Sequence, residues 1–89
     1  MNFGQALEAL KSGKRVTRKG WNRKGMWLML VKSSSHETIS ETSAYGAVGL
    51  TCDVTINAHI DIMTATGSMQ PGWIPAQADI LAEDWEKIS

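Results

Sequence analysis

Two tryptophans lie where they could stack on a nucleotide base. Trp21 and Trp73 each follow a glycine, and each lies in or beside a predicted loop next to a strand. An indole face in that position can stack on a purine and contribute about 1–3 kcal/mol per base, and a nearby cation, Arg18 or Arg23, could contact a phosphate. The alternative is that both indoles belong to the core, because tryptophan is highly buried on average.

Other groupings of reactive side chains match no enzyme or metal site. Cys52, His59 and Asp61 have no standard zinc spacing, and a second cysteine is missing. The adjacent carboxylates Glu83 and Asp84 make a poor acid–base pair because neighbouring residues do not face each other on a helix, although Asp84 could accept a ligand hydroxyl. The local signatures of thiol and serine enzymes are absent. We therefore predict a non-enzymatic protein with no catalytic residue, metal or cofactor.

The charges are unevenly distributed along the chain. Residues 1–32 hold eight Lys or Arg and one acid, and residues 33–89 hold eight acids and one Lys, so the chain is neutral overall. The halves either neutralise each other across the fold or a subunit interface, or the basic half forms an anion site with phosphate as the obvious ligand. A general DNA-binding domain is usually net basic, so we consider nucleic acid an unlikely partner.

Length and composition indicate one small folded domain spanning residues 1–89. With 89 residues the chain buries roughly 60–70% of its unfolded surface. No apolar run approaches the ~20 residues that cross a bilayer, and no secretory signal opens the chain, so we expect no membrane partner. A single cysteine is compatible with a reducing cytoplasm.

The N-terminal third predicts a helix and two strands. In residues 2–12 the apolar positions Phe3, Ala6, Leu7 and Leu10 form one stripe, Asn2 is placed as N-cap with Gln5 as its capping-box partner, and Gly13 suits the C-terminal end. Residues 14–18 predict a strand, 19–25 a loop and 26–32 a second strand. This second strand is apolar on both faces, which favours a covering subunit.

The remaining elements are expected to be short. Residues 33–53 are polar and glycine-rich, which indicates a flexible or inserted loop, with short strands as an open alternative. Residues 54–64 alternate as a strand, or as two with a break near Asn57-Ala58. A turn at Gly67-Ser68 leads into a strand in which Pro71 must lie at an edge. Residues 75–82 predict a helical turn with Ile80 and Leu81 inward, after which Trp85 and Ile88 return to the core.

These elements give an α+β fold, with an N-terminal helix packed on a small antiparallel sheet, a short C-terminal helical turn, and an oligomeric state. The segments NFGQALEALKSGKRVTRKGW, GMWLMLV and PGWIPAQADILAEDW, in residues 2–32 and 60–88, resemble the second type of Thoeris anti-defence proteins, a small phage and prophage family. Residues 33–53 fit no part of this pattern.

The resemblance implies a sponge that sequesters glycocyclic ADP-ribose, a signal made by TIR-domain defence proteins, without cleaving it, in the cytoplasm of the infected bacterial host. It further implies a homotetramer, assembled as a dimer of dimers, with ligand at subunit interfaces, and binding of cyclic di- or trinucleotides by some members. On this account the ligand-binding residues are Trp21 and Trp73 for stacking, Asn22, Gln77 and Asp84 for base edges or hydroxyls, and Arg18 for phosphate, with Arg23 or Lys24 as alternatives.

Two other functions remain open from the residues. The basic loop and its tryptophans could bind single-stranded nucleic acid, although the zero net charge argues against this. The basic half could instead dock on an acidic partner protein.

Overall fold

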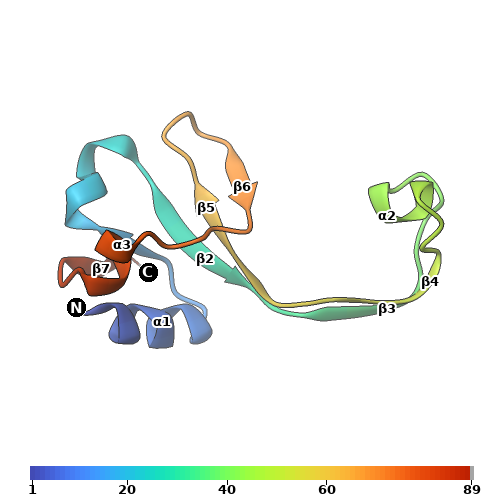
Figure 1. The fold of residues 1–89 in the computed structure, drawn as a ribbon, viewed down its shortest axis with the longest axis horizontal. Coiled ribbons are helices and arrows are strands. Elements are labelled where there is room, and N and C mark those ends of the chain that lie inside the picture. The colour runs from blue at the N-terminus through green and yellow to red at the C-terminus, as the bar shows by residue number, and fades with distance from the viewer. Residues whose placement is uncertain (89) are drawn as a thin grey trace.

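The computed structural model describes residues 1–88, apart from the side chains of residues 22–24. Residues 1–32 and 58–88 form a body, and residues 33–57 form an arm that projects from it (Figure 1). The body contains an antiparallel sheet in the order β6-β5-β2-β1-β7, with bounds Met69–Pro71, His59–Met63, Trp27–Val31, Val16–Arg18 and Trp85–Lys87. The predicted combination of helix and antiparallel sheet is thus confirmed.

Helix α1, Phe3–Lys11, forms as predicted because its ends are satisfied locally. The Asn2 side chain accepts a hydrogen bond from Gln5 N (2.8 Å), and Gln5 Oε1 accepts one from Asn2 N (2.9 Å). Gly13 follows the helix at φ 85°, a left-handed conformation that glycine adopts at little cost. The apolar stripe faces β1, β2 and β7, and it buries Ala6, Ala9 and Leu10.

The core lies between α1 and one face of the sheet. Val16 on β1 is paired with Leu28 on β2, and both side chains are fully buried. The prediction that Trp85 returns to the core is confirmed, since only 1% of it is exposed. Half-buried residues packed against this centre include Leu30, Ile60 and Ile62.

The opposite face of the sheet also carries apolar side chains. On β2 this face holds Trp27, Met29 and Val31, each partly exposed, and Trp27 is paired with Met63 of β5. Strand β2 lies between β1 and β5 in the sheet, and its core face packs against α1. No helix among residues 1–88 packs on its other face. We call this second face the outer face.

The connection between β1 and β2 differs from the prediction. Residues 19–25 were expected to form a loop, whereas Lys19–Lys24 form the 3₁₀ helix η1.

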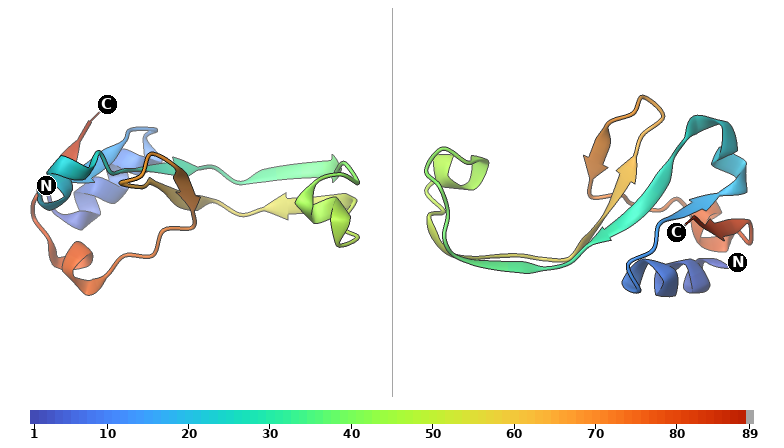
Figure 2. Two further views of the ribbon diagram at one scale, coloured as in Figure 1. Left: turned by 90° about the horizontal axis from the view of Figure 1, so that it is seen from above. Right: turned by 180° about the vertical axis from the view of Figure 1, so that it is seen from behind.

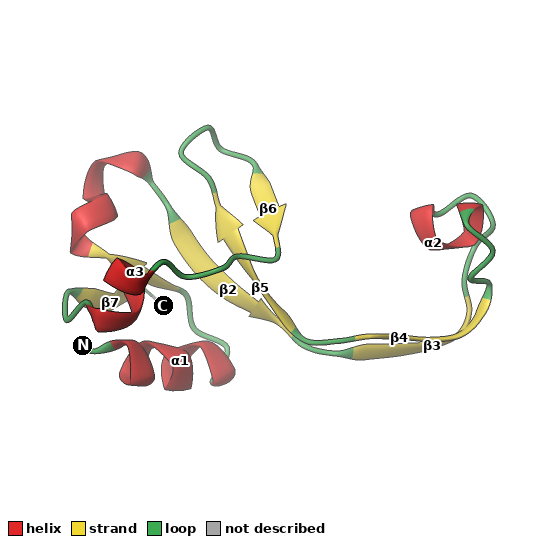
Figure 3. Ribbon diagram, in the orientation of Figure 1, coloured by secondary structure: helices red, strands yellow, loops and turns green. Residues whose placement is uncertain are grey.

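Residues 33–57 form a two-stranded ribbon rather than a structureless loop (Figure 3). Strand β3, Ser34–Thr38, pairs with β4, Cys52–Ile56, and the short helix α2, Ala44–Ala47, lies at the tip. No apolar alternation reveals β3 in the sequence, because all five of its residues are exposed. The predicted break near Asn57-Ala58 is confirmed, since β4 ends at Ile56 and β5 begins at His59.

The C-terminal segment agrees with the prediction only in part. Pro71 ends β6, an edge strand, and α3 covers Gln77–Leu81. The inward placement of Ile80, Leu81 and Ile88 is wrong, because their exposed fractions are 48%, 71% and 44%. The reason is that α3 directs Asp79, which is 9% exposed, toward the body, so the adjacent Ile80 and Leu81 face outward.

Candidate functional site

Trp21 and Trp73 belong to one cluster of aromatic rings with Trp85 and Phe3. The centroid of Trp21 lies 5.3 Å from that of Trp85 and 6.1 Å from that of Trp73, with interplanar angles of 78° and 76°. Phe3 completes the cluster at 5.6 Å from Trp85 and 6.4 Å from Trp73. The near-perpendicular contacts among the indoles are favourable for aromatic rings. Both Trp21 and Trp73 are half-buried, so each is a core residue with a partly accessible surface.

Glycines bring the two half-buried tryptophans into place. At Gly72 the backbone adopts φ 82°, and the next amide, Trp73 N, donates to Ile60 O at 2.7 Å, which turns the chain from β6 back onto the body. At Gly20 the requirement is space, because a Cβ there would lie 3.3 Å from Asp84 Oδ2. Gly20 N instead donates to that oxygen at 2.9 Å.

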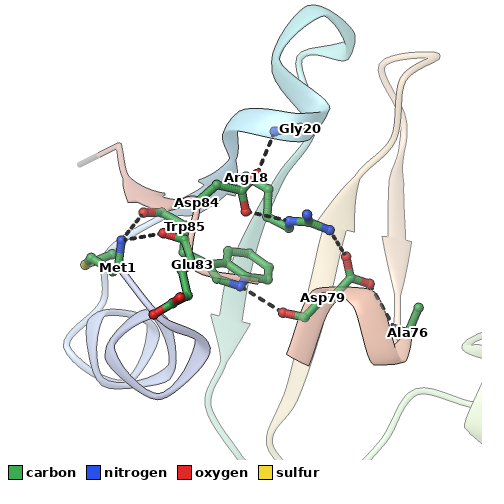
Figure 4. A network of polar contacts seen from close by, with 8 residues as sticks. All are labelled: Met1, Arg18, Gly20, Ala76, Asp79, Glu83, Asp84 and Trp85. Atoms are coloured by element: carbon green, nitrogen blue, oxygen red, sulfur yellow. Dashed lines mark hydrogen bonds and ion pairs between the residues drawn. The ribbon is translucent and has the colours of Figure 1, made fainter. Parts of the chain in front are cut away.

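Arg18 forms an ionic cluster with two carboxylates from the C-terminal segment (Figure 4). Its Nε donates to Asp84 Oδ1 at 2.9 Å, and its Nη1 donates to Asp79 Oδ1 at 2.8 Å. Asp79 also accepts from Ala76 N at 2.9 Å, and its carbonyl accepts from Trp85 Nε1 at 3.0 Å. The cluster therefore joins the end of β1 to α3 and to the start of β7, beside the aromatic rings.

Charge pairing shifts the pKa values of this cluster in opposite directions. The hydrogen bond from Arg18 is the main cause that lowers the pKa of Asp84, and the Gly20 amide adds to it. The bonds to Asp84 and then to Asp79 raise the pKa of Arg18. One cation with two carboxylates leaves a formal charge of −1, so the cluster does not by itself attract phosphate.

A cavity of about 510 Å³ opens beside Trp73, between α1 and the base of the arm. Its wall is almost entirely apolar, and it includes Leu7, Leu30, Ile60 and Trp73. The polar side chains in the lining are Lys11 and His59, and His59 Nε2 lies 3.6 Å from Asp61 Oδ1. Such a mixture of apolar wall and few polar groups is typical of small-molecule sites.

The structure brings together four of the six predicted ligand-binding residues. Trp21 and Trp73 are in ring contact, and Arg18 is bonded to Asp84. The fifth, Gln77, is exposed at the first position of α3, the helix that also carries Asp79. The Asn22 side chain lies outside the described residues, as do those of Arg23 and Lys24.

Sequence reasoning missed Asp79, Lys11 and His59. The one sequence feature that could have indicated Asp79 is its position in the first turn of a helix. There a carboxylate can accept hydrogen bonds from backbone N–H groups that have no partner within the helix. No sequence pattern pointed to the cavity, because Lys11 and His59 come from segments far apart in the chain.

The described part of the chain contains neither a metal-binding cluster nor a membrane-spanning helix. There, no group of three or more His, Cys, Asp or Glu side chains could hold a metal ion. The helices between residues 1 and 88 fall short of the length and apolar content that a bilayer crossing requires.

Comparison with known proteins assigns this chain to a family. The Thoeris anti-defense 2-like domain matches residues 1–88. Thoeris anti-defense 2 of Bacillus phage SP01 is 38% identical over 89 residues, which is 100% of this chain and 96% of that protein. The match includes residues 33–53, for which the terminal motifs gave no indication. The chain belongs to the Thoeris anti-defense 2-like family, as its terminal segments indicated.

Proposed function

We propose that the protein binds glycocyclic ADP-ribose made by TIR-domain proteins and sequesters it without cleavage, so that the Thoeris effector is not activated. The family supports a role in phage anti-defence. The observation that carries the ligand class is the position of Trp73, which belongs both to the aromatic cluster and to the wall of the apolar cavity.

The adenine of the ligand would occupy the cavity against Trp73. Trp21 meets Trp73 edge to face, so it holds the Trp73 ring in one orientation and has its own partly accessible surface for a second contact. Base stacking of this kind contributes about 1–3 kcal/mol per base. A stoichiometric sponge needs nanomolar affinity, about −12 kcal/mol, so stacking must be supplemented by polar contacts.

The ionic cluster suits ribose hydroxyls better than phosphate. The Asp84 carboxylate is ionised, partly exposed and held in place by Arg18 and Gly20, so it can accept hydroxyl hydrogen bonds. For Arg18 we propose that it positions Asp84, and that it reaches a phosphate only if one carboxylate moves away. Gln77 and Asn22 would serve base edges or further hydroxyls.

The pyrophosphate would be met by Lys11 from the mouth of the cavity. Its side chain is 66% exposed, and its one ion pair within the described residues, to Glu8, is long at 3.9 Å, so the ammonium can move to a ligand at little cost.

Holding rather than cleaving the ligand agrees with the side chains available. The lining of the cavity, in the part of the chain described, contains no serine, cysteine or carboxylate that could act as nucleophile, so its one possible base, His59, has no nucleophilic side chain there to activate. Next to the rings, Arg18 is bonded to both Asp84 and Asp79, so these side chains already have partners. We place this activity in the cytoplasm of the infected bacterial host, where the signal is produced.

We further propose that the protein works as a homotetramer, a dimer of dimers. On β2 the outer face is apolar at Trp27, Met29 and Val31, and no helix among residues 1–88 packs on it, which is typical of a surface buried by association. Polar groups border this patch, since Asp61 is paired with Met29 and the Arg15 guanidinium lies over Trp27. The other contact of a dimer of dimers, on the α1 side of the sheet, would close the cavity that is open in one chain, so a protein of 89 residues could enclose a dinucleotide-sized ligand.

Isothermal titration calorimetry with glycocyclic ADP-ribose tests the proposal. We expect tight binding, and chromatography of the nucleotide released by heating should recover it intact. Trp73→Ala should weaken binding at least tenfold, since it removes a stacking contact of about 1–3 kcal/mol. Tyr45→Ala is the control, because Tyr45 is an aromatic residue 43% exposed on α2 that does not line the cavity, and circular dichroism would confirm that both variants are folded.

The other outcomes separate the competing functions. Release of a hydrolysed nucleotide would show an enzyme and contradict sequestration. If titration with glycocyclic ADP-ribose gives no heat but cyclic di- or trinucleotides bind, those nucleotides would be the ligands of the site. Binding of single-stranded DNA that weakens steeply with salt would instead support a nucleic-acid module.

A further inference from the structure

Each of the two Gly-Trp pairs is bonded to an aspartate from another part of the chain. Gly20 N donates to Asp84 Oδ2 at 2.9 Å. Gly72 N donates to Asp61 Oδ1 at 3.3 Å. In both cases the bonded amide belongs to the glycine that directly precedes the tryptophan. A carboxylate that holds this amide therefore fixes the backbone from which the indole projects.

The turn before Trp73 depends on such a bond because β6 ends in a proline. Pro71 is paired with Asp61 and has no N–H to donate to β5. The next N–H belongs to Gly72, which donates to Ile60 O at 3.1 Å as well as to the Asp61 carboxylate. With φ at 82°, Gly72 then turns the chain from the sheet edge toward α3 (Figures 1 and 2). The position of Trp73 is thus determined by two neighbouring residues of β5.

Asp61 is an unusual residue for its place in the sheet. Its side chain is only 13% exposed, and its paired neighbours are Met29 and Pro71, whose side chains cannot donate a hydrogen bond. Burial of a carboxylate is unfavourable unless it is hydrogen-bonded or paired. The groups that approach its Oδ1 are Gly72 N and, at 3.6 Å, His59 Nε2. An acid kept at this position therefore indicates a specific task.

Asp61 faces away from the cavity. Side chains alternate along β5, so Asp61 lies on the outer face beside Met29, whereas Ile60 and Ile62 pack toward the core. Ile60 and Trp73 line the cavity, and Asp61 does not. An effect of Asp61 on a ligand in the cavity would therefore be transmitted through the backbone of the turn.

We propose that Asp61 is a positioning residue that presets Trp73 for ligand binding by holding Gly72 N. It acts on Trp73 as Asp84, through the amide of the other glycine, acts on Trp21. This inference rests on the proposed function, in which a base stacks on Trp73. Because the turn is held before the ligand arrives, less conformational freedom is lost on binding, which raises the affinity.

Amide hydrogen exchange measured by NMR tests the positioning in the ligand-free protein. Asp61→Ala removes the acceptor, so the Gly72 and Trp73 amides should exchange about three- to tenfold faster, as for the loss of one ordinary hydrogen bond. Asp61→Asn keeps a side-chain oxygen for Gly72 N and should exchange at nearly the wild-type rate. Wild-type exchange rates in Asp61→Ala, or an Asn variant that exchanges as fast as the Ala variant, would overturn the proposal.

Met29→Ala is the matched control for this measurement. It alters the outer face at the position paired with Asp61 but leaves the carboxylate in place, so exchange at Gly72 should not change. Sedimentation velocity should give Asp61→Ala the same mass as the wild type. The same acceleration in Met29→Ala, or a different mass for Asp61→Ala, would contradict the proposal, because the effect would then come from the outer face as a whole.

A double-mutant cycle with glycocyclic ADP-ribose tests whether Asp61 acts through Trp73. By calorimetry, Asp61→Ala should weaken binding about three- to tenfold, and Asp61→Asn should recover most of that loss. In the Trp73→Ala background the indole is absent, so Asp61→Ala should cause no further loss. Additive losses in the double variant would refute the positioning role, because Asp61 would then act by another route.

The two experiments distinguish the positioning role from the sponge. Faster exchange in Asp61→Ala together with no binding by the wild type would refute the sponge and leave Asp61 as the residue that positions Trp73. Tight binding by the wild type that Asp61→Ala leaves unchanged would refute the positioning role and leave the sponge intact.

Discussion

Replacing Trp85 with phenylalanine should be one of the most destabilising conservative changes in this protein. Trp85 is 1% exposed, contacts Phe3, Trp21 and Trp73, and donates a hydrogen bond from Nε1 to Asp79 O. Phenylalanine keeps one aromatic ring in the cluster but removes two carbons and the Nε1–H group. The change therefore separates the contribution of the indole from that of aromatic packing in general.

The magnitude follows from two contributions. Two buried carbons at about 0.8 kcal/mol each give roughly 1.6 kcal/mol. The lost hydrogen bond adds about 0.5–1 kcal/mol and not the full cost of an unpaired carbonyl, because Asp79 O also accepts from Ala82 N at 3.4 Å. The sum is about 2 kcal/mol, out of roughly 4–13 kcal/mol expected for a chain of this length. The variant should fold, with a Tm lowered by about 8–16 °C.

Calorimetry and urea titration, each at two protein concentrations, would measure the loss of stability. Trp27→Phe is the matched control: Trp27 is half-buried on the outer face under the Arg15 guanidinium, 4.9 Å from its ring centroid, and should lose about 1 kcal/mol or less. Equal losses in the two variants, or a Tm change below about 4 °C for Trp85→Phe, would refute the packing described for the aromatic cluster.

Two further predictions concern the ionic cluster and the arm. The pKa of Asp84 is lowered in the folded state, so its contribution is present above the ordinary value of 3.8 and is lost as pH falls through the lower folded pKa. Asp84→Asn should therefore flatten the fall in urea midpoint below about pH 4, and an unchanged slope would contradict the pairing with Arg18. Gly46→Ala should loosen the arm tip, because the new Cβ would overlap the carbonyl oxygen of Ser40 and the Cα of Glu41. We expect faster proteolysis within residues 40–50 and an unchanged Tm of the body, and a lower body Tm would show that the arm supports it.

The helix and the turns were predictable because their causes are local. The capping box of α1 joins residues three positions apart, and the apolar stripe repeats within each turn. The edge position of Pro71 follows from its missing N–H. The ribbon was harder to predict because both faces of β3 are polar and exposed, so no alternation shows its period. Ile80 and Leu81 were placed inward by hydrophobicity alone, which cannot decide the face that a five-residue helix buries.

The sequence by itself determined the N-terminal helix, the antiparallel α+β class, the family and the importance of Trp85, because these depend on neighbouring residues or on recognisable motifs. Only the tertiary structure decided that Arg18 is bonded to Asp79 and Asp84, 61 and 66 positions away, and that Trp73 joins the aromatic rings to a cavity. Contacts of such separation arise from the order of strands in the sheet and from the packing of the chain ends. No spacing along the sequence encodes them, because every residue between the partners contributes to where they meet.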